Sequence, residues 1–176
     1  MLSDLLTENL IKKIIGLCKE YDILTAVDPK RKNFFAYKGV DIFKPNLKEV
    51  KDGLNILREE INSSALTEMH HLLQDKLKHV ISLITLSEKG IFYAQHPMDQ
   101  QENNAAIIPT HIRSIADVSG AGDTVIAVAS LVFAATGNAK LMAEMANIAG
   151  GLVCEEVGTV AIDKNRLMEE CKKLLT

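Results

Sequence analysis

The sequence contains little of what several classes of protein require. Its three cysteines, Cys18, Cys154 and Cys171, include no Cys-x-x-Cys pair, so we expect reduced core thiols rather than disulfides or a zinc site. Lys and Arg number 20 against 23 Asp and Glu and form no cluster, which argues against nucleic-acid binding. Because no signal segment and no long apolar run occur, we expect no membrane partner and a cytoplasmic location.

What the chain does have is the composition of one globular domain. Its 176 residues are 47% hydrophobic and 24% charged, which suits a single packed core. Apolar periodicity predicts helices over residues 4–20, 47–60, 64–78, 124–135, 139–156 and 164–174. Apolar runs predict strands over residues 23–27, 40–43, 80–86, 91–94 and 105–109. This alternation indicates an α/β fold with a mainly parallel sheet and one antiparallel hairpin, turning at 87–90.

The strongest chemical signal is residues 117–124, Asp-Val-Ser-Gly-Ala-Gly-Asp-Thr, directly before the most apolar predicted helix. Glycines at 120 and 122 let a phosphate approach the free N–H groups of a helix start. Asp123 could then take a proton from an attacking hydroxyl. Alternatively, Asp123 only caps a helix behind a glycine turn. A flavin or nicotinamide phosphate site is the weaker reading, since the third glycine is missing.

These eight residues resemble the second signature of the ribokinase-like (PfkB) carbohydrate kinase family. The resemblance implies a ribokinase-like three-layer sandwich that binds ATP and magnesium. It also implies that the backbone of Gly120, Ala121 and Gly122 forms the anion hole, and that Asp123 is the catalytic base and contacts the sugar.

Two further segments are similar to family elements. Residues 44–49, Lys-Pro-Asn-Leu-Lys-Glu, resemble the Asn-x-x-Glu element, which implies that Asn46 and Glu49 organise magnesium and that Lys44 and Asn46 face the nucleotide. The alternative for Glu49 is a capping box. Residues 85–90 resemble the segment bordering the nucleotide, implying contacts from the residues Thr85, Ser87 and Gly90, whereas an ordinary hairpin turn explains the glycine equally well.

The end of the chain also resembles the family. Residues 146–151 and 157–159 resemble its closing helix and loop, which implies that Asn147 flanks the adenine. By the same resemblance, Asp117 and Ser119, together with backbone of residues 154–159, are the candidate potassium ligands. The alternative for Asn147 is a polar residue on a helix surface.

Within the family, residues 28–30, 34, 37–49 and 117–126 look most similar to the heptose-7-phosphate kinase domain of ADP-heptose synthesis. This resemblance implies ATP-dependent conversion of D-glycero-D-manno-heptose 7-phosphate to the 1,7-bisphosphate for the lipopolysaccharide core, and a parent protein fused to a nucleotidyltransferase domain. Lys30 is then a candidate partner of the sugar or its phosphate, or else simply exposed. Kinases of ribose, fructose or fructose phosphate, and a non-catalytic nucleotide-binding fragment, are the alternatives.

The resemblance covers only the C-terminal half of such a kinase, because nothing matches the N-terminal strands and lid. We therefore expect a nucleotide-binding portion that is inactive alone, since closure over the sugar requires the lid. We also expect an exposed sheet edge or apolar face near the first helix and strand. Pairing between copies as a homodimer, or poor solubility, would follow from that face.

Overall fold

The computed structural model describes residues 6–57, 60–96, 104–111 and 114–175, which contain one five-stranded sheet. The strand order is β1-β2-β3-β4-β5. The strands are β1 Ala26–Val27, β2 Ile42–Phe43, β3 Ile81–Thr85, β4 Ile91–Gln95 and β5 Ala105–Ile108. β1, β2 and β3 pair in parallel, and β4 is antiparallel to both of its neighbours. Only β4 therefore runs against the others, which confirms the predicted mainly parallel sheet with its hairpin.

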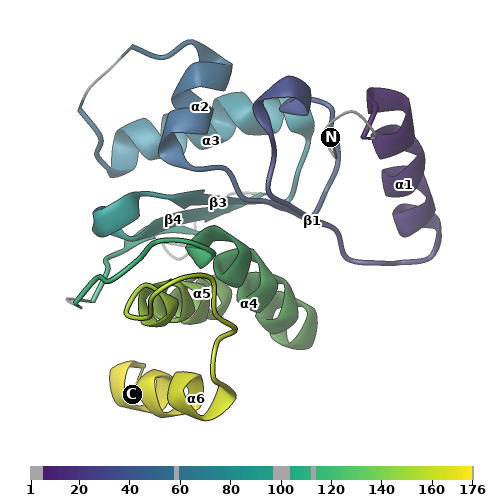
Figure 1. Ribbon diagram of the computed structural model, residues 1–176. Coiled ribbons are helices and arrows are strands. Elements are labelled where there is room, and N and C mark those ends of the chain that lie inside the picture. The colour runs from purple at the N-terminus through teal and green to yellow at the C-terminus, as the bar shows by residue number, and fades with distance from the viewer. Residues whose placement is uncertain (1–5, 58–59, 97–103, 112–113, 176) are drawn as a thin grey trace.

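Helices cover both faces of this sheet (Figure 1). They are α1 Glu8–Glu20, α2 Leu47–Leu54, α3 Ser63–Leu77, α4 Ala121–Thr136, α5 Ala139–Val153 and α6 Lys164–Leu174, with 3-10 turns η2 Arg31–Asn33 and η3 Ser87–Lys89. α2 and α3 lie on one face, α4 and α5 on the other with α6 outside α5, and α1 stands beside the β1 edge. The predicted three-layer arrangement is confirmed. In the described part of the chain, no helix has the length and apolar character needed to cross a membrane.

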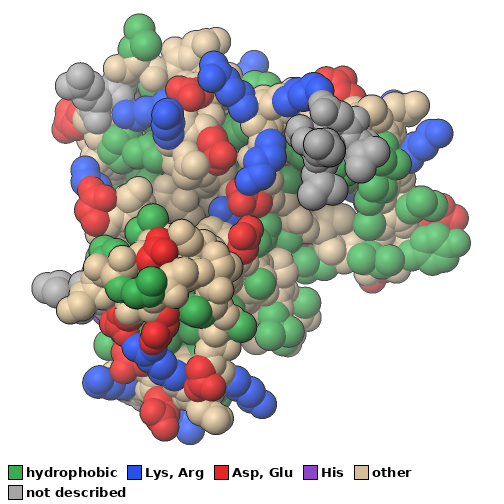
Figure 2. Space-filling view, viewed as in Figure 1, with side chains coloured by type: hydrophobic (Ala, Val, Ile, Leu, Met, Phe, Trp, Pro, Cys, Tyr) green, Lys and Arg blue, Asp and Glu red, His purple; other side chains and the backbone are tan. Residues whose placement is uncertain are grey.

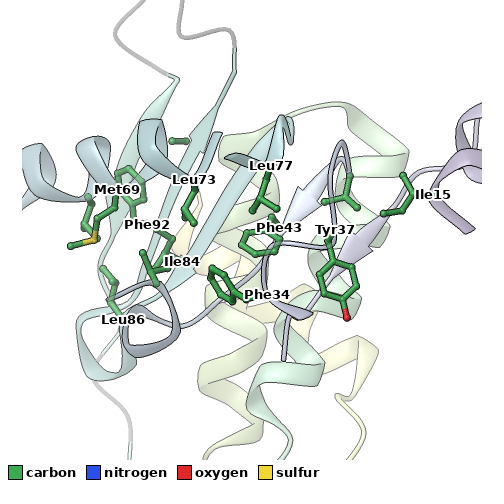
Figure 3. Packing of buried hydrophobic residues seen from close by; sticks show 14 of the residues in the cluster. Ile15, Phe34, Tyr37, Phe43, Met69, Leu73, Leu77, Ile84, Leu86 and Phe92 are labelled. Atoms are coloured by element: carbon green, nitrogen blue, oxygen red, sulfur yellow. The ribbon is translucent and has the colours of Figure 1, made fainter. Parts of the chain in front are cut away.

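Each helical layer forms its own core against the sheet. On one side, Met69, Leu73 and Leu77 recur every fourth residue along α3 and point toward Phe43 and Phe92 (Figure 3). On the other side, α4 and α5 bury mainly alanine and valine side chains against the opposite face. A Cβ at position 150 would lie 2.7 Å from the Val125 side chain, so the small residues permit the close packing of these two helices.

The first two strands are shorter than predicted because side-chain hydrogen bonds replace part of the ladder. The Thr25 amide and hydroxyl both donate to Oδ2 of Asp41, each at 2.7 Å, and the Asp41 amide donates to the Thr25 hydroxyl at 3.0 Å. These bonds join the residue before β1 to the residue before β2, where regular strand pairing begins. Strands expected over 23–27 and 40–43 are consequently two residues long each.

Several helix ends also differ from the prediction. The helix expected over 47–60 stops at Leu54, because Asn55 adopts a left-handed conformation with φ of 55°; positions 58–59 lie outside the described residues. The first helix starts at Glu8 behind a Thr7 cap, with residues 1–5 outside the description. The helix expected from 124 already begins at Ala121, so the glycine turn is itself the helix start.

An apolar surface follows α1 as predicted. Leu10, Ile14 and Leu17 are 40%, 44% and 56% exposed, and Tyr21 and Ile23 continue the surface. Among the described residues, β1 pairs only with β2, so its outer edge has no strand beside it. The predicted exposed edge is confirmed, and the pairing of copies across it stays a prediction. Of the cysteines expected in the core, only Cys171 is buried, while Cys18 and Cys154 are half-buried.

Sequence reasoning did not predict a buried pair of histidines joined by a serine. His70 of α3 lies 2.9 Å and His79 lies 2.6 Å from the Ser82 hydroxyl of β3. Both rings are buried, and their remaining nitrogens have no hydrogen-bond partner among the described residues. Burial, reinforced by neighbouring histidines including His96, lowers the pKa of His70 to about 4 and that of His79 to about 3.

This pair makes the fold sensitive to acid. Because the folded-state pKa values lie below the ordinary value of 6.5, the unfolded chain binds more protons below that pH. The free energy of unfolding should fall as the pH drops from 6.5 toward about 4 and 3, by up to about 1.4 kcal/mol per pH unit for each histidine. Urea unfolding at pH 7, 6 and 5 measures this slope. His79→Gln should flatten it, whereas His111→Gln should not; equal slopes in all three proteins would contradict the assignment.

Candidate functional site

The candidate site lies where the parallel strands end, which we call the carboxyl edge of the sheet. Asp28 follows β1 and Lys44 follows β2. Lys44 is only 3% exposed, and its Nζ lies 3.2 Å from Oδ1 of Asp28. The exposed Lys30 reaches the other oxygen of Asp28 at 3.7 Å. A buried ammonium with one carboxylate partner therefore marks this edge.

The glycine turn forms the start of α4 beside that ammonium. Gly120 has φ of +79°, and a Cβ there would lie 2.8 Å from the Thr159 methyl group, so glycine is required on both grounds. Among the described residues, the amides of Gly122 and Asp123 have no hydrogen-bond acceptor. The Asp123 side chain is exposed. The turn thus keeps the free donors that attract anions to a helix start.

The Lys44 ammonium lies next to this glycine turn. A Cβ at position 122 would lie 3.6 Å from Nζ of Lys44, so the bare backbone of Gly122 faces the ammonium. Free amides and a fixed cation therefore lie together at the start of α4, which also carries the exposed carboxylate of Asp123. Such a set of groups can hold a phosphoryl group and accept a proton beside it. Our sequence reasoning did not select Asp28 as a site residue, although a carboxylate directly after a parallel strand and before proline was an available signal.

The two segments predicted to form a cation site do lie together. Oδ1 of Asp117 accepts hydrogen bonds from the Ser119 amide at 2.9 Å and hydroxyl at 2.8 Å, and Oδ2 accepts from the Gly158 amide at 3.0 Å. These donors lower the pKa of Asp117. The Cys154 carbonyl also accepts from the Asp117 amide at 3.2 Å. The Asp117 carboxylate is therefore already engaged in fixing the turn.

Arg166 on α6 pairs with two glutamates of the loop that contains Gly158, and we call these ion pairs the Arg166 clamp. The Arg166 guanidinium donates to Oε1 of Glu156 at 2.7 Å and to Oε2 of Glu155, two residues that lie just before Gly158. Through Gly158 and Asp117, this clamp reaches the turn that opens α4. Sequence reasoning missed Arg166, because ion pairs between a loop and a later helix leave no local pattern.

Asn46 and Glu49 form a capping box at the start of α2. Oδ1 of Asn46 accepts from the Glu49 amide, and Oε2 of Glu49 accepts from the Asn46 amide, both at 2.8 Å. This is the alternative considered for Glu49, and it occupies one of its two carboxylate oxygens. The backbone of Asn46 also forms an isolated parallel β-bridge with Thr85 at the end of β3. Asn46 and Thr85, both predicted site residues, therefore lie at the carboxyl edge. Among the described residues, no group of three or more His, Cys, Asp or Glu is arranged to hold a metal ion.

The structure explains Gly90 by backbone packing. It has φ of +100°, and a Cβ there would lie 2.0 Å from the Ile108 carbonyl oxygen. Any other residue at this position would therefore clash with the backbone at the end of β5. Ser87 is exposed and has φ of 55°, at the end of the strand that carries Thr85. Both residues thus shape the turn at this edge.

Asn147 is not the surface residue that the alternative described. It is 8% exposed, and its Nδ2 donates to the Pro109 carbonyl at 2.9 Å. Because Pro109 follows β5, this hydrogen bond fastens α5 to the end of that strand. Asn147 therefore lies at the β5 side of the carboxyl edge, opposite the β1 side that carries Lys30.

A glycine turn that opens α4 beside a strand-end lysine, in a three-layer α/β sandwich, is an arrangement suited to binding a phosphoryl group. The chain belongs to the pfkB family of carbohydrate kinases, whose family model matches residues 2–165. Among curated relatives, it is 32% identical over 166 residues to Bifunctional protein HldE of Granulibacter bethesdensis, which covers 94% of this chain and 34% of that protein. It is 34% identical over 166 residues to Bifunctional protein HldE of Aliarcobacter butzleri, covering 93% and 33%.

The chain thus spans about a third of the length of these curated relatives. Phosphofructokinase-2 from Escherichia coli in complex with potassium superposes with a TM-score of 0.82 at 17% identity, covering 97% of this chain and 54% of that one. Ribokinase from Arabidopsis thaliana complexed with ribose and ATP gives 0.76 at 15% identity, covering 93% and 52%. At such identities, these structures establish the ribokinase-like fold.

The clamp predicts how the turn responds to loss of Arg166. Arg166→Met should release the 155–158 segment and speed hydrogen exchange of the Gly158 and Ser119 amides about 3- to 10-fold, since partly exposed ion pairs contribute about 1 kcal/mol or less each. Exchange resolved by residue measures the effect. Lys173→Met is the matched control, because the ion pair that this lysine forms with a described residue, Glu170, lies within α6. Unchanged exchange in Arg166→Met would refute the clamp.

Proposed function

We propose that the chain supplies the nucleotide-binding and catalytic part of an ATP-dependent sugar kinase that acts on a heptose 7-phosphate. One observation carries the proposal: the exposed Asp123 lies at the start of α4, together with a buried ammonium and amides that have no acceptor in the described part of the chain. A helix start that only needed a cap would satisfy its amides with a side chain, yet Gly120 provides none.

In the proposed reaction, the Asp123 carboxylate takes the proton of the sugar hydroxyl. The hydroxyl oxygen forms a bond to the γ-phosphorus of ATP, and the bond from that phosphorus to the bridging oxygen of ADP breaks. The Gly122 and Asp123 amides and Lys44 stabilise the negative charge on the transferring group. Lys44 is suited to this because its ammonium is already desolvated and held by Asp28.

Magnesium and potassium fit the residues in different ways. Magnesium, when bound with ATP, neutralises phosphate charge, and Asn46 and Glu49 are the residues proposed to organise it, through the Glu49 oxygen left free by the capping box. Asp117 and Ser119 stand beside the 154–159 backbone. This placement supports the proposal that they border a potassium site, which stabilises the loop behind the turn.

The nucleotide is assigned to the β3–β5 side of the edge. Thr85, Ser87 and Gly90 shape the turn between β3 and β4, and Asn147 lies at the end of β5. We assign the adenine to the neighbourhood of Asn147 and the triphosphate to the path toward Gly122. The sugar then approaches from the β1 side, where Lys30 is exposed.

The heptose substrate rests on the relatives and not on the site alone. The matched relatives carry the name Bifunctional protein HldE, and the sequence resemblance in residues 28–49 and 117–126 points to heptose 7-phosphate as acceptor. A second function, adenylyl transfer by a fused nucleotidyltransferase domain, belongs to the same proposal for the parent protein. Pairing of copies across the α1 surface is the proposed assembly.

The proposal predicts a specific defect in Asp123→Asn. In the full-length protein, this change should keep ATP binding and lower phosphoryl transfer to heptose 7-phosphate by about 10²–10⁴-fold, because it removes the base but no binding group. ATP affinity by calorimetry and turnover by ADP release measure the two effects. Asp75→Asn, on an exposed part of α3, is the matched control and should behave like the unaltered protein.

If Asp123→Asn turns over at a rate near that of the unaltered protein, Asp123 is not the catalytic base. Substrate choice is tested separately by comparing kcat/KM for heptose 7-phosphate, ribose, fructose and fructose 6-phosphate. Transfer to one of the other three sugars with higher kcat/KM would replace the proposed acceptor while leaving the phosphoryl-transfer site intact.

A further inference from the structure

A large groove with a basic lining opens between α1 and α2, on the side of the site away from Asn147. Its volume is about 1180 Å³, enough for a sugar phosphate. We call it the α1–α2 groove. The basic residues that line it are Lys12, Arg31, Lys32, Lys38 and Lys48.

The walls of this groove are fixed by packing rather than by the charged side chains. Ile15 on α1 and Phe34 on the floor both belong to the buried core cluster. A Cβ at position 53 would lie 2.8 Å from the Phe34 ring, so α2 lies directly against that floor. Nδ2 of Asn33 donates to the Leu6 carbonyl and ties the η2 segment to the approach of α1. The groove is therefore a built feature of the fold.

Charge gives the groove its chemistry. Five cationic side chains line it against three carboxylates, and one of these, Glu49, is engaged in the capping box. Lys12, Arg31, Lys38 and Lys48 form no ion pair with a described residue. In Figure 2, Lys and Arg side chains gather over the upper part of this face, above α2 and the neighbouring turn. Unpaired cations around a half-enclosed groove favour a compact anion.

The groove begins where the acceptor should lie. Its residues Arg31–Asn33 follow the end of β1, and its residues Asn46, Lys48 and Glu49 follow the end of β2. Lys44, two residues before Asn46, faces Gly122 in the glycine turn at the start of α4. The groove and the turn therefore lie on adjacent strand ends of one carboxyl edge, while the assigned nucleotide side lies at β3–β5.

We propose that the α1–α2 groove binds the phosphate monoester of the acceptor sugar phosphate, with Lys12 on α1 and Arg31 on η2 contacting it. The proposal rests on the proposed kinase function and adds its source of specificity. A sugar anchored by its phosphate in the groove extends its far end toward Asp123. An unphosphorylated sugar lacks this anchor and binds weakly.

Binding to the full-length protein tests the groove without requiring turnover. Lys12→Gln and Arg31→Gln should each weaken heptose 7-phosphate binding about tenfold or more, as expected for loss of a hydrogen bond to a charged group. Binding of unphosphorylated heptose and of ATP should not change. Lys13→Gln on the adjacent α1 position and Lys51→Gln on α2, neither of which lines the groove, are matched controls. Calorimetry gives all the constants.

Each other result has a definite meaning. Equal weakening of heptose and heptose 7-phosphate, or no weakening of either, overturns the groove as the phosphate site even if kinase activity stands. Loss of inorganic phosphate binding in the variants, with heptose 7-phosphate affinity intact, reassigns the groove to a separate phosphate effector and also overturns the proposal. If the unaltered protein does not bind heptose 7-phosphate, while both variants lose inorganic phosphate, the acceptor fails and the phosphate site in the groove stands.

Discussion

The site depends on one buried ammonium. Lys44 is held at the carboxyl edge by Asp28 and faces the backbone of Gly122, so its positive charge lies close to the positive end of the α4 dipole. These two charges repel each other, and the Asp28 carboxylate beside the ammonium offsets part of the repulsion. An anion placed between them would be attracted by both, so the arrangement gains stability when a phosphoryl group binds.

This gain requires that the turn cannot relax away from the ammonium. The backbone of Gly120 packs against the Thr159 side chain, and the Asp117 carboxylate accepts hydrogen bonds from Ser119 and Gly158. Arg166 on the outermost helix holds the residues before Gly158. Each contact comes from a different part of the C-terminal third of the chain, and together they fix free amides that would otherwise reorient toward protein acceptors. Through the 155–158 segment, α6 is thereby connected to the turn that opens α4.

Local pattern was sufficient to predict the layers and the turn. Apolar runs predicted the five strands of the described sheet, and the glycines at 120 and 122 indicated the turn at the start of α4 and a candidate anion site there, because both signals act within a few residues of sequence. The His70–Ser82–His79 cluster, the Arg166 clamp and the Asp28–Lys44 pair were missed, since each joins groups that only the fold brings together. Side-chain bonds between Thr25 and Asp41 shortened β1 for the same reason. The assigned roles of Glu49 and Asn147 stay proposals, although their contacts are now defined.

The strand order gives the carboxyl edge two distinct sides. β4 and β5 are joined to α5 through Asn147, whereas β1 and β2 lead into the basic groove. Lys44 follows β2, between these two regions, and is the cation that can contact a group passing from one to the other. If the proposed assignments hold, specificity for a phosphorylated acceptor and transfer of the phosphoryl group are separable. Charges on the groove walls then set affinity for the acceptor, while the fixed turn and Asp123 set the rate of the chemical step.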